Sequence, residues 1–128
     1  MPPTLKTPAK STDKELQIST YAFVREFNNA ASAVHQTARE KGWWDKPRDD
    51  GRLIALIHSE LSEALEALRH GNPPDDKILL YSGAEAELAD AIIRIMDMAV
   101  ARKWRVAEAI VAKMAVNRLR PHMHGKQF

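Results

Sequence analysis

Two segments of the sequence each carry a pair of acidic residues three positions apart. The first pair is Glu60 and Glu63, and the second is Glu87 and Asp90. In an α-helix this spacing places both side chains of a pair on the same face. A single pair of this kind is common on solvated helices, where basic residues neutralise it. Two pairs on consecutive helical segments indicate instead that the four carboxylates act together.

Apolar residues surround both pairs. In the first segment, at about 100° per residue, Glu60 lies at the edge of an apolar arc, so we expect it to be partly buried. The arc consists of Leu53, Ile54, Ile57, Leu61, Ala64, Leu65 and Leu68. In the second segment, apolar residues cover most of the circumference and leave a narrow polar stripe. The stripe consists of Glu87, Asp90, Arg94 and Asp97, and we expect Asp97 to bind Arg94. Carboxylates buried together are unfavourable unless cations compensate their charge, so the sequence predicts a metal site formed by the four acids.

The residue types of this site favour a hard metal ion. An all-carboxylate ligand set suits Mg²⁺, with Mn²⁺ as a possible substitute. The rival, a di-iron bundle, requires a Glu-x-x-His motif on two helices, and no histidine stands three positions after any of the acids Glu60, Glu63 and Glu87. His58 lies on the other side of its helix from Glu63. We therefore expect His58 to be a surface or packing residue rather than a ligand.

Composition narrows the function classes. The chain of 128 residues contains no cysteine, which excludes a disulfide scaffold and a thiolate zinc site and is compatible with a cytoplasmic protein. The net charge is only +2. The chain from Arg102 onward is basic but has no broad basic face with interleaved aromatics, so we expect no nucleic-acid partner. Residues 1–12 contain no apolar run, so we expect neither a signal peptide nor a membrane anchor.

The apolar spacing predicts an all-α fold in a single domain of residues 19–128. We expect four helices, at residues 19–41, 52–70, 82–103 and 106–119, arranged as a four-helix bundle. Ser82 and Glu85 form a capping-box sequence at the start of the third helix, and Gly42 and Gly71 suit helix C-termini. Residues 1–18 are expected to form a flexible tail. Whether residues 12–18 extend the first helix is left open by their sequence.

The two acidic motifs, in this order, resemble those of the MazG-like all-α nucleotide pyrophosphohydrolases. That family has E-x-x-E on one helix and E-x-x-D on the next, which here are Glu60-Leu-Ser-Glu63 and Glu87-Leu-Ala-Asp90. The flanking segments also match: Gly42-Trp-Trp-Asp45 precedes the first motif, and a K-x-x-x-N-x-x-R-P segment starts at Lys113. The resemblance covers roughly residues 23–128.

The resemblance implies hydrolysis of a nucleoside triphosphate, often a deoxynucleotide, to the monophosphate and pyrophosphate, for nucleotide-pool control or the removal of damaged nucleotides. It gives the role of magnesium ligands to Glu60, Glu63, Glu87 and Asp90. Glu63 is a candidate for activating the attacking water, although the choice among the four acids stays open. The resemblance implies that Lys113, Asn117, Arg120 and, more weakly, Lys126 bind the phosphates. It implies that His35 and Trp44 belong to the base pocket. The sequence leaves open whether Trp43 or Trp44 points into the protein.

Subunit association is a further expectation. Relatives bury helix faces between subunits, and a helix that is apolar on nearly all sides gains from a partner. We therefore expect a homodimer or a homotetramer. Two alternatives to the main reading stay open: a non-catalytic helical interaction module on the same scaffold, and a phosphoribosyl-ATP pyrophosphohydrolase type of activity. The preferred base and sugar do not follow from the sequence.

Overall fold

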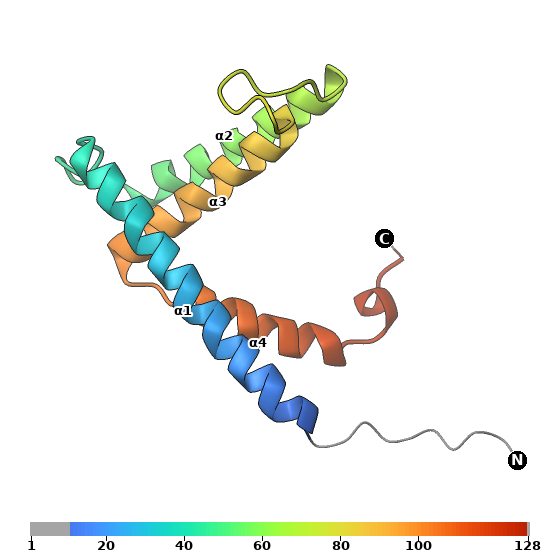
Figure 1. Cartoon of the computed structure of the whole chain (residues 1–128). Coiled ribbons are helices and arrows are strands. Elements are labelled where there is room, and N and C mark those ends of the chain that lie inside the picture. Colours follow the sequence, from blue (N-terminus) through green and yellow to red (C-terminus); the bar gives the residue numbers. More distant parts are fainter. Residues whose placement is uncertain (1–10, 128) are drawn as a thin grey trace, which may run out of the picture. The chain divides into compact units, whose positions relative to one another are not determined.

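Four α-helices make up the part of the chain that the computed structural model describes, which is the backbone of residues 11–127 and the side chains of residues 19–127 (Figure 1). The helices are α1 (Ser11–Glu40), α2 (Asp50–Arg69), α3 (Gly83–Arg102) and α4 (Val106–Leu119), followed by the short 3-10 segment η1 (His122–Gly125). The described residues contain one isolated β-bridge, between Pro74 and Ser82, and no strand. The predicted all-α class is confirmed.

The helix ends follow the capping signals in the sequence. The side chain of Asp49 accepts a hydrogen bond from the backbone N of Arg52 at the start of α2, over 3.0 Å. At the start of α3, Ser82 Oγ accepts from the backbone N of Glu85 and Glu85 Oε2 accepts from the backbone N of Ser82, so the predicted capping box is present. Gly42 has a φ of +86° directly after α1, a conformation that glycine adopts without steric cost.

The first helix begins earlier than residue 19. It starts at Ser11, so residues 11–18 of the expected tail are helical, while residues 1–10 lie outside the described part. Lys14, Glu15, Leu16 and Gln17 are all good helix formers. An established helix extends at low cost through such residues. The apolar periodicity begins only at residue 19, so it predicted a first helix that is too short.

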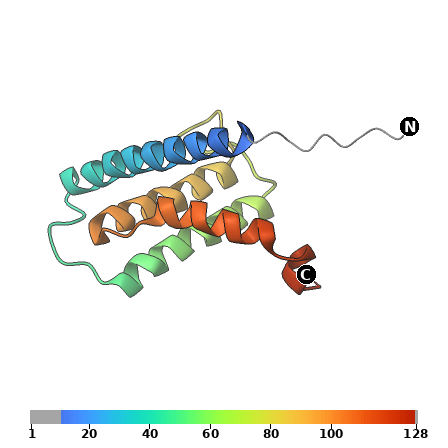
Figure 2. The same ribbon diagram turned by 90° about the horizontal axis from the view of Figure 1, so that it is seen from below.

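Contacts within the chain divide it into two compact units. One unit consists of the two ends, up to Asn29 and from Arg105 onward, and the other consists of residues 30–104. In the second unit α2 and α3 run antiparallel and side by side, as Figures 1 and 2 both show. A Cβ atom on Gly83 would lie 3.0 Å from Cβ of Ala67, so the end of α2 and the start of α3 approach closely.

The interface of α2 and α3 is narrower than the predicted apolar arc. The buried residues of these two helices are Leu53, Glu60 and Ala64 on α2, and Ala84, Ala86, Ala91, Met98 and Ala99 on α3. Apart from the half-buried Ile57, the rest of the arc is exposed, because one neighbouring helix covers only a strip of each surface. Ile54, Leu61, Leu65 and Leu68 are 43%, 46%, 51% and 56% exposed. Leu88, Ile92 and Ile93 of α3 are exposed to a similar extent.

In the first unit, the N-terminal part of α1 lies against α4. Asn28 Nδ2 donates a hydrogen bond to Glu108 Oε1 over 3.2 Å, and Ala107 is fully buried. Phe23 and Phe27 contact each other with ring centroids 5.8 Å apart. The side chains of Phe23, Met114 and Asn117 line a groove between the two helices. Among the described residues, no helix combines the length and the apolar character needed to cross a membrane.

Candidate functional site

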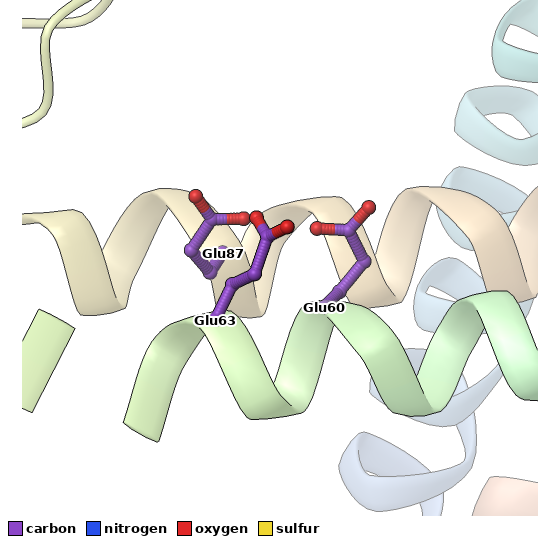
Figure 3. Close-up of side chains that lie close together, drawn as sticks. All are labelled: Glu60, Glu63 and Glu87. Atoms are coloured by element: carbon purple, nitrogen blue, oxygen red, sulfur yellow. The ribbon is translucent and has the colours of Figure 1, made fainter. Parts of the chain in front are cut away.

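Three of the four predicted metal ligands come together on the α2–α3 pair. Glu60 and Glu63 of α2 and Glu87 of α3 each place one carboxylate oxygen within 4.8 Å of the other two (Figure 3). The i, i+3 spacing aims both α2 glutamates to one side, and the antiparallel packing brings Glu87 opposite them. Glu60 is 8% exposed, as expected from its place beside the apolar arc, whereas Glu63 is exposed.

Asp90, the fourth predicted ligand, lies next to this group rather than inside it. It is exposed and lines a pocket together with Glu60. Loss of solvent and, after it, the neighbouring charge of Glu60 raise the pKa of Asp90. The structure therefore brings all four predicted acids to one region of α2 and α3, with Glu60 central to it.

The pKa of Glu87 is affected by its burial and by the other acids of the group. Its partial burial, followed by the neighbouring carboxyl groups of Glu60 and Glu63, raises the pKa of Glu87 to about 7. A carboxyl group with such a pKa holds its proton unless a cation stabilises the charged form. This response is expected of carboxylates assembled to receive a cation, and equally of any crowded acidic surface.

Arg94 supplies the positive charge nearest to Glu60. Its Nε donates a hydrogen bond to Glu60 Oε1 over 2.8 Å, and the side chains of Arg94 and Glu60 are 36% and 11% exposed. The expectation that Arg94 binds Asp97 is therefore wrong. Arg94 and Asp97 are neighbours on one face of α3. Arg94 reaches across to the nearly buried carboxylate of Glu60 on α2, whereas Asp97 is hydrogen-bonded to His35 and Trp44.

The hard oxygen ligands of the acidic group fit a magnesium ion. In octahedral coordination with bonds of about 2.1 Å, ligand oxygens are separated by about 3 to 4 Å. The oxygens of Glu60, Glu63 and Glu87, within 4.8 Å of one another, reach such separations with small side-chain rotations. Glu60 and Glu63 from α2 and Glu87 from α3 would hold the ion, and Asp90 lines the adjoining pocket together with Glu60.

A pocket of about 300 Å³ begins at the acidic group. Glu60, Asp90 and Arg94 line it from α2 and α3, and Trp43 and Arg48 line it from the connector between α1 and α2. Lys41 also lines it. Acidic and basic side chains thus share one hollow, as required for a ligand that carries both a metal ion and phosphates. Trp43, Arg48 and Lys41 were not predicted as site residues from their sequence positions, and only the competition between Trp43 and Trp44 pointed to this connector.

His35 and Trp44, the two expected base-pocket residues, meet at Asp97. His35 Nδ1 lies 2.8 Å from Asp97 Oδ1, and Trp44 Nε1 donates to Oδ1 and Oδ2 of Asp97 over 2.9 and 3.2 Å. The His35 and Trp44 rings contact each other edge to face, with centroids 5.4 Å apart. His35 and Trp44 line a second pocket, in which Arg39 and Glu40 also take part. Asp97 is thus the hydrogen-bonding centre of α1, the connector and α3.

The expected phosphate-binding residues all belong to the unit formed by the chain ends. Lys113 and Asn117 lie in α4, Arg120 is the C-cap residue of α4, and Lys126 is the C-cap residue of η1. All four are exposed. The acidic group belongs to the other unit.

Comparison with known proteins gives no family assignment. No protein-family model matches the chain, and neither the curated proteins nor the solved structures contain a significant match.

Proposed function

We propose that this chain is a magnesium-dependent nucleoside triphosphate pyrophosphohydrolase of the MazG-like type. The observation that carries the proposal is the meeting of Glu60, Glu63 and Glu87 from two helices, with oxygens within 4.8 Å of one another. Glu60 also lines a pocket that contains basic side chains. Three of the four acids in the two motifs that resemble the family meet in this group. One member of the group, Glu60, is nearly buried, which is uncommon for a glutamate on a solvated acidic surface.

The proposed reaction is attack of water on the α–β phosphate linkage, which releases the nucleoside monophosphate and pyrophosphate. Bound magnesium would offset the charge that develops on the phosphates and lower the pKa of the attacking water. Glu63 is the candidate to orient or deprotonate that water, because it belongs to the acidic group, is exposed and carries no ion pair among the described residues. Glu60, paired with Arg94, serves as a metal ligand in this scheme.

The resemblance assigns the binding of phosphate oxygens to residues of α4 and the C-terminal segment. A lysine, an amide and a guanidinium, here Lys113, Asn117 and Arg120, are suitable donors for that task. Lys113 and Asn117 are four positions apart in α4 and lie on the same side of it, and Arg120 follows directly after the helix as its C-cap residue. Lys126 is a further cation for the same purpose.

The exposed apolar residues of α2 and α3 support association of two or four copies. Leu61, Leu65 and Leu68 form an apolar row with spacing of three and four residues, and all of them are exposed in the isolated chain. Burial of such a row removes apolar surface from water, which stabilises an interface. Sedimentation of the protein at micromolar concentration should show a dimer or tetramer, and a stable monomer would contradict this part of the proposal.

The main test is enzymatic. Standard and modified ribonucleoside and deoxyribonucleoside triphosphates, incubated with the protein and Mg²⁺, should release pyrophosphate from at least one substrate, and a chelator should stop the release. Phosphoribosyl-ATP belongs in the same panel, since its hydrolysis would indicate the related activity. If no substrate yields pyrophosphate, the alternative of a non-catalytic helical module takes the place of this proposal.

A further inference from the structure

We infer that Arg48 and Trp43 form the base-binding end of the pocket that starts at Glu60 and Asp90. The inference rests on the proposed function and assigns the nucleoside part of its substrate. Both residues belong to the connector between α1 and α2, and both line this pocket together with the two acids. His35 and Trp44, in contrast, line the second pocket.

The guanidinium of Arg48 is largely buried but incompletely hydrogen-bonded. Its side chain is 15% exposed, and its ion pair with Asp97 Oδ2 spans 3.9 Å, which is too long for a hydrogen bond. In the described residues, the side-chain hydrogen bonds to Asp97 come from His35 and Trp44 and not from Arg48. A guanidinium has five N–H donors. None of the described side chains leaves a fully buried nitrogen without a hydrogen-bond partner, so the unpaired donors of Arg48 reach solvent. The structure therefore leaves donors of Arg48 available to a ligand in the pocket.

The surroundings of Arg48 hold this guanidinium in place. It lies over the Trp44 ring at 4.9 Å and over the Trp43 ring at 5.8 Å from the centroids. Arg102 donates a hydrogen bond to the backbone carbonyl of Arg48 and pairs with Asp50 over 2.6 Å. A donor that is fixed before the ligand arrives loses little conformational freedom on binding.

The two tryptophans of the connector differ in what they can offer a base. Trp44 uses its Nε1–H on Asp97, and both Arg48 and Arg102 lie over its ring at 4.9 and 5.8 Å. Trp43 is 61% exposed and faces the pocket of the acids. Of the described cationic groups, only Arg48 lies over the Trp43 ring, so Trp43 has more open ring surface than Trp44 on which a base can stack, and Trp44 supports Arg48.

The distance along α3 matches this arrangement. Asp97, the ion-pair partner of Arg48, follows Asp90 by seven residues, which is about 10 Å along a helix. That separation is comparable with the extent of a nucleotide from its α-phosphate to its base. With the phosphates at the acids, the base reaches Trp43, and Arg48 donates to acceptor atoms on the base edge, as guanidinium groups do in other nucleotide contacts.

Binding of non-hydrolysable ligands tests the assignment. We would titrate the protein, in Mg²⁺, with the α,β-methylene triphosphates of adenosine, guanosine, cytidine and uridine, and with inorganic tripolyphosphate. For the nucleotide that binds most tightly, Arg48→Met should weaken binding about tenfold or more, the loss of one hydrogen bond to a charged group. Tripolyphosphate binding should stay unchanged, because it lacks the base. Trp43→Phe should remove most of the nucleotide-induced quenching of tryptophan fluorescence, and Trp44→Phe should retain it.

Arg39→Met is the matched control, because Arg39 is exposed and lines the second pocket with His35 and Trp44. It should bind all ligands as wild type does. Loss of nucleotide binding in Arg39→Met but not in Arg48→Met would move the base to the second pocket and overturn the assignment. Equal losses for nucleotide and tripolyphosphate in Arg48→Met would overturn it as well, since Arg48 would then contact phosphate.

Three unfavourable outcomes can be told apart: a variant that does not fold, failure of the proposed function, and failure of the base-site assignment alone. If Arg48→Met does not fold, Arg48→Lys keeps the charge but loses the planar fork, and its selective loss of nucleotide affinity decides the question together with Trp43→Phe. If wild-type protein binds none of the four nucleotides and releases pyrophosphate from none of the substrates in the enzymatic panel, the proposed function itself fails. If wild type binds and Arg48→Met and Trp43→Phe bind equally well, only the present assignment fails.

Discussion

Arg94 on α3 donates a hydrogen bond to Glu60 on α2 over 2.8 Å, and this pair places one positive charge against the acidic group. We expect Arg94→Met to destabilise the metal-free protein by about 1 to 3 kcal/mol, because it leaves the nearly buried Glu60 carboxylate without its cation. Magnesium should reduce the deficit, since the ion replaces the lost charge. Urea unfolding with chelator and with Mg²⁺ measures both effects.

The control for this experiment is Arg69→Met. Arg69 pairs with Glu66 over 3.7 Å at the exposed end of α2, with side chains 67% and 58% exposed. Exposed pairs of this kind contribute about 0 to 1 kcal/mol, so the variant should unfold close to wild type. If Arg94→Met lowers the free energy of unfolding by the same amount with and without Mg²⁺, then Arg94 and the metal act at separate places.

Glu87 makes the stability of the metal-free protein depend on pH. Its pKa is raised from 4.5 to about 7 in the folded state, so the folded protein binds more protons than the unfolded chain between these values. Stability from this group is therefore fully present below pH 4.5 and is lost as the pH rises through about 7. The raised pKa of Asp90 acts in the same direction. Thermal unfolding over this range, compared with Glu87→Gln, should show a shallower fall in the variant.

The same pKa predicts that magnesium displaces a proton. Since a ligand must be ionised to bind the ion, binding at a pH below about 7 should release close to one proton from Glu87. Calorimetric titrations with Mg²⁺ in buffers of different ionisation enthalpy measure the number released. No proton release at pH 6, together with normal binding, would separate Glu87 from the metal.

Glu63 and Glu66 on α2 provide a matched pair of substitutions. Glu63 belongs to the acidic group, whereas Glu66 pairs with Arg69 and His70; both are exposed. Glu63→Gln should lower pyrophosphate release about 100-fold or more and keep the wild-type circular dichroism spectrum. Glu66→Gln should leave both unchanged. Undiminished turnover in Glu63→Gln would remove Glu63 from the site.

We expect Trp44 to stabilise the fold through its hydrogen bond to Asp97. Trp44→Phe removes the Nε1–H donor to Asp97, whose side chain is 13% exposed, and should lower stability by about 1 to 3 kcal/mol. Trp104→Phe is the control, since Trp104 is 50% exposed. Chemical denaturation of both variants measures the difference, and equal stability would mean that His35 alone is sufficient to hold Asp97.

Local patterns in the sequence were sufficient to predict the helices and much of the acidic group. The start of α3 at Ser82 and the end of α4 at Leu119 follow from a capping box and from Pro121, which act within a few residues. The partial burial of Glu60 follows from its position beside an apolar arc. The start of α1 did not follow, because residues 11–18 are helix formers without an apolar period.

Only the tertiary structure decided which side chains meet. Arg94 and Glu60 are 34 residues apart in sequence, and Asp97 is 53 and 62 residues from Trp44 and His35. Helical periodicity places Arg94 and Asp97 on the polar stripe of α3, and this spacing predicted an ion pair between them. The antiparallel packing of α2 and α3, and the connector before α2, gave each of them a different partner. The sequence alone determined which residues could bind a cation, and the packing of distant segments determined their neighbours, because a side chain pairs with the group that burial brings to it.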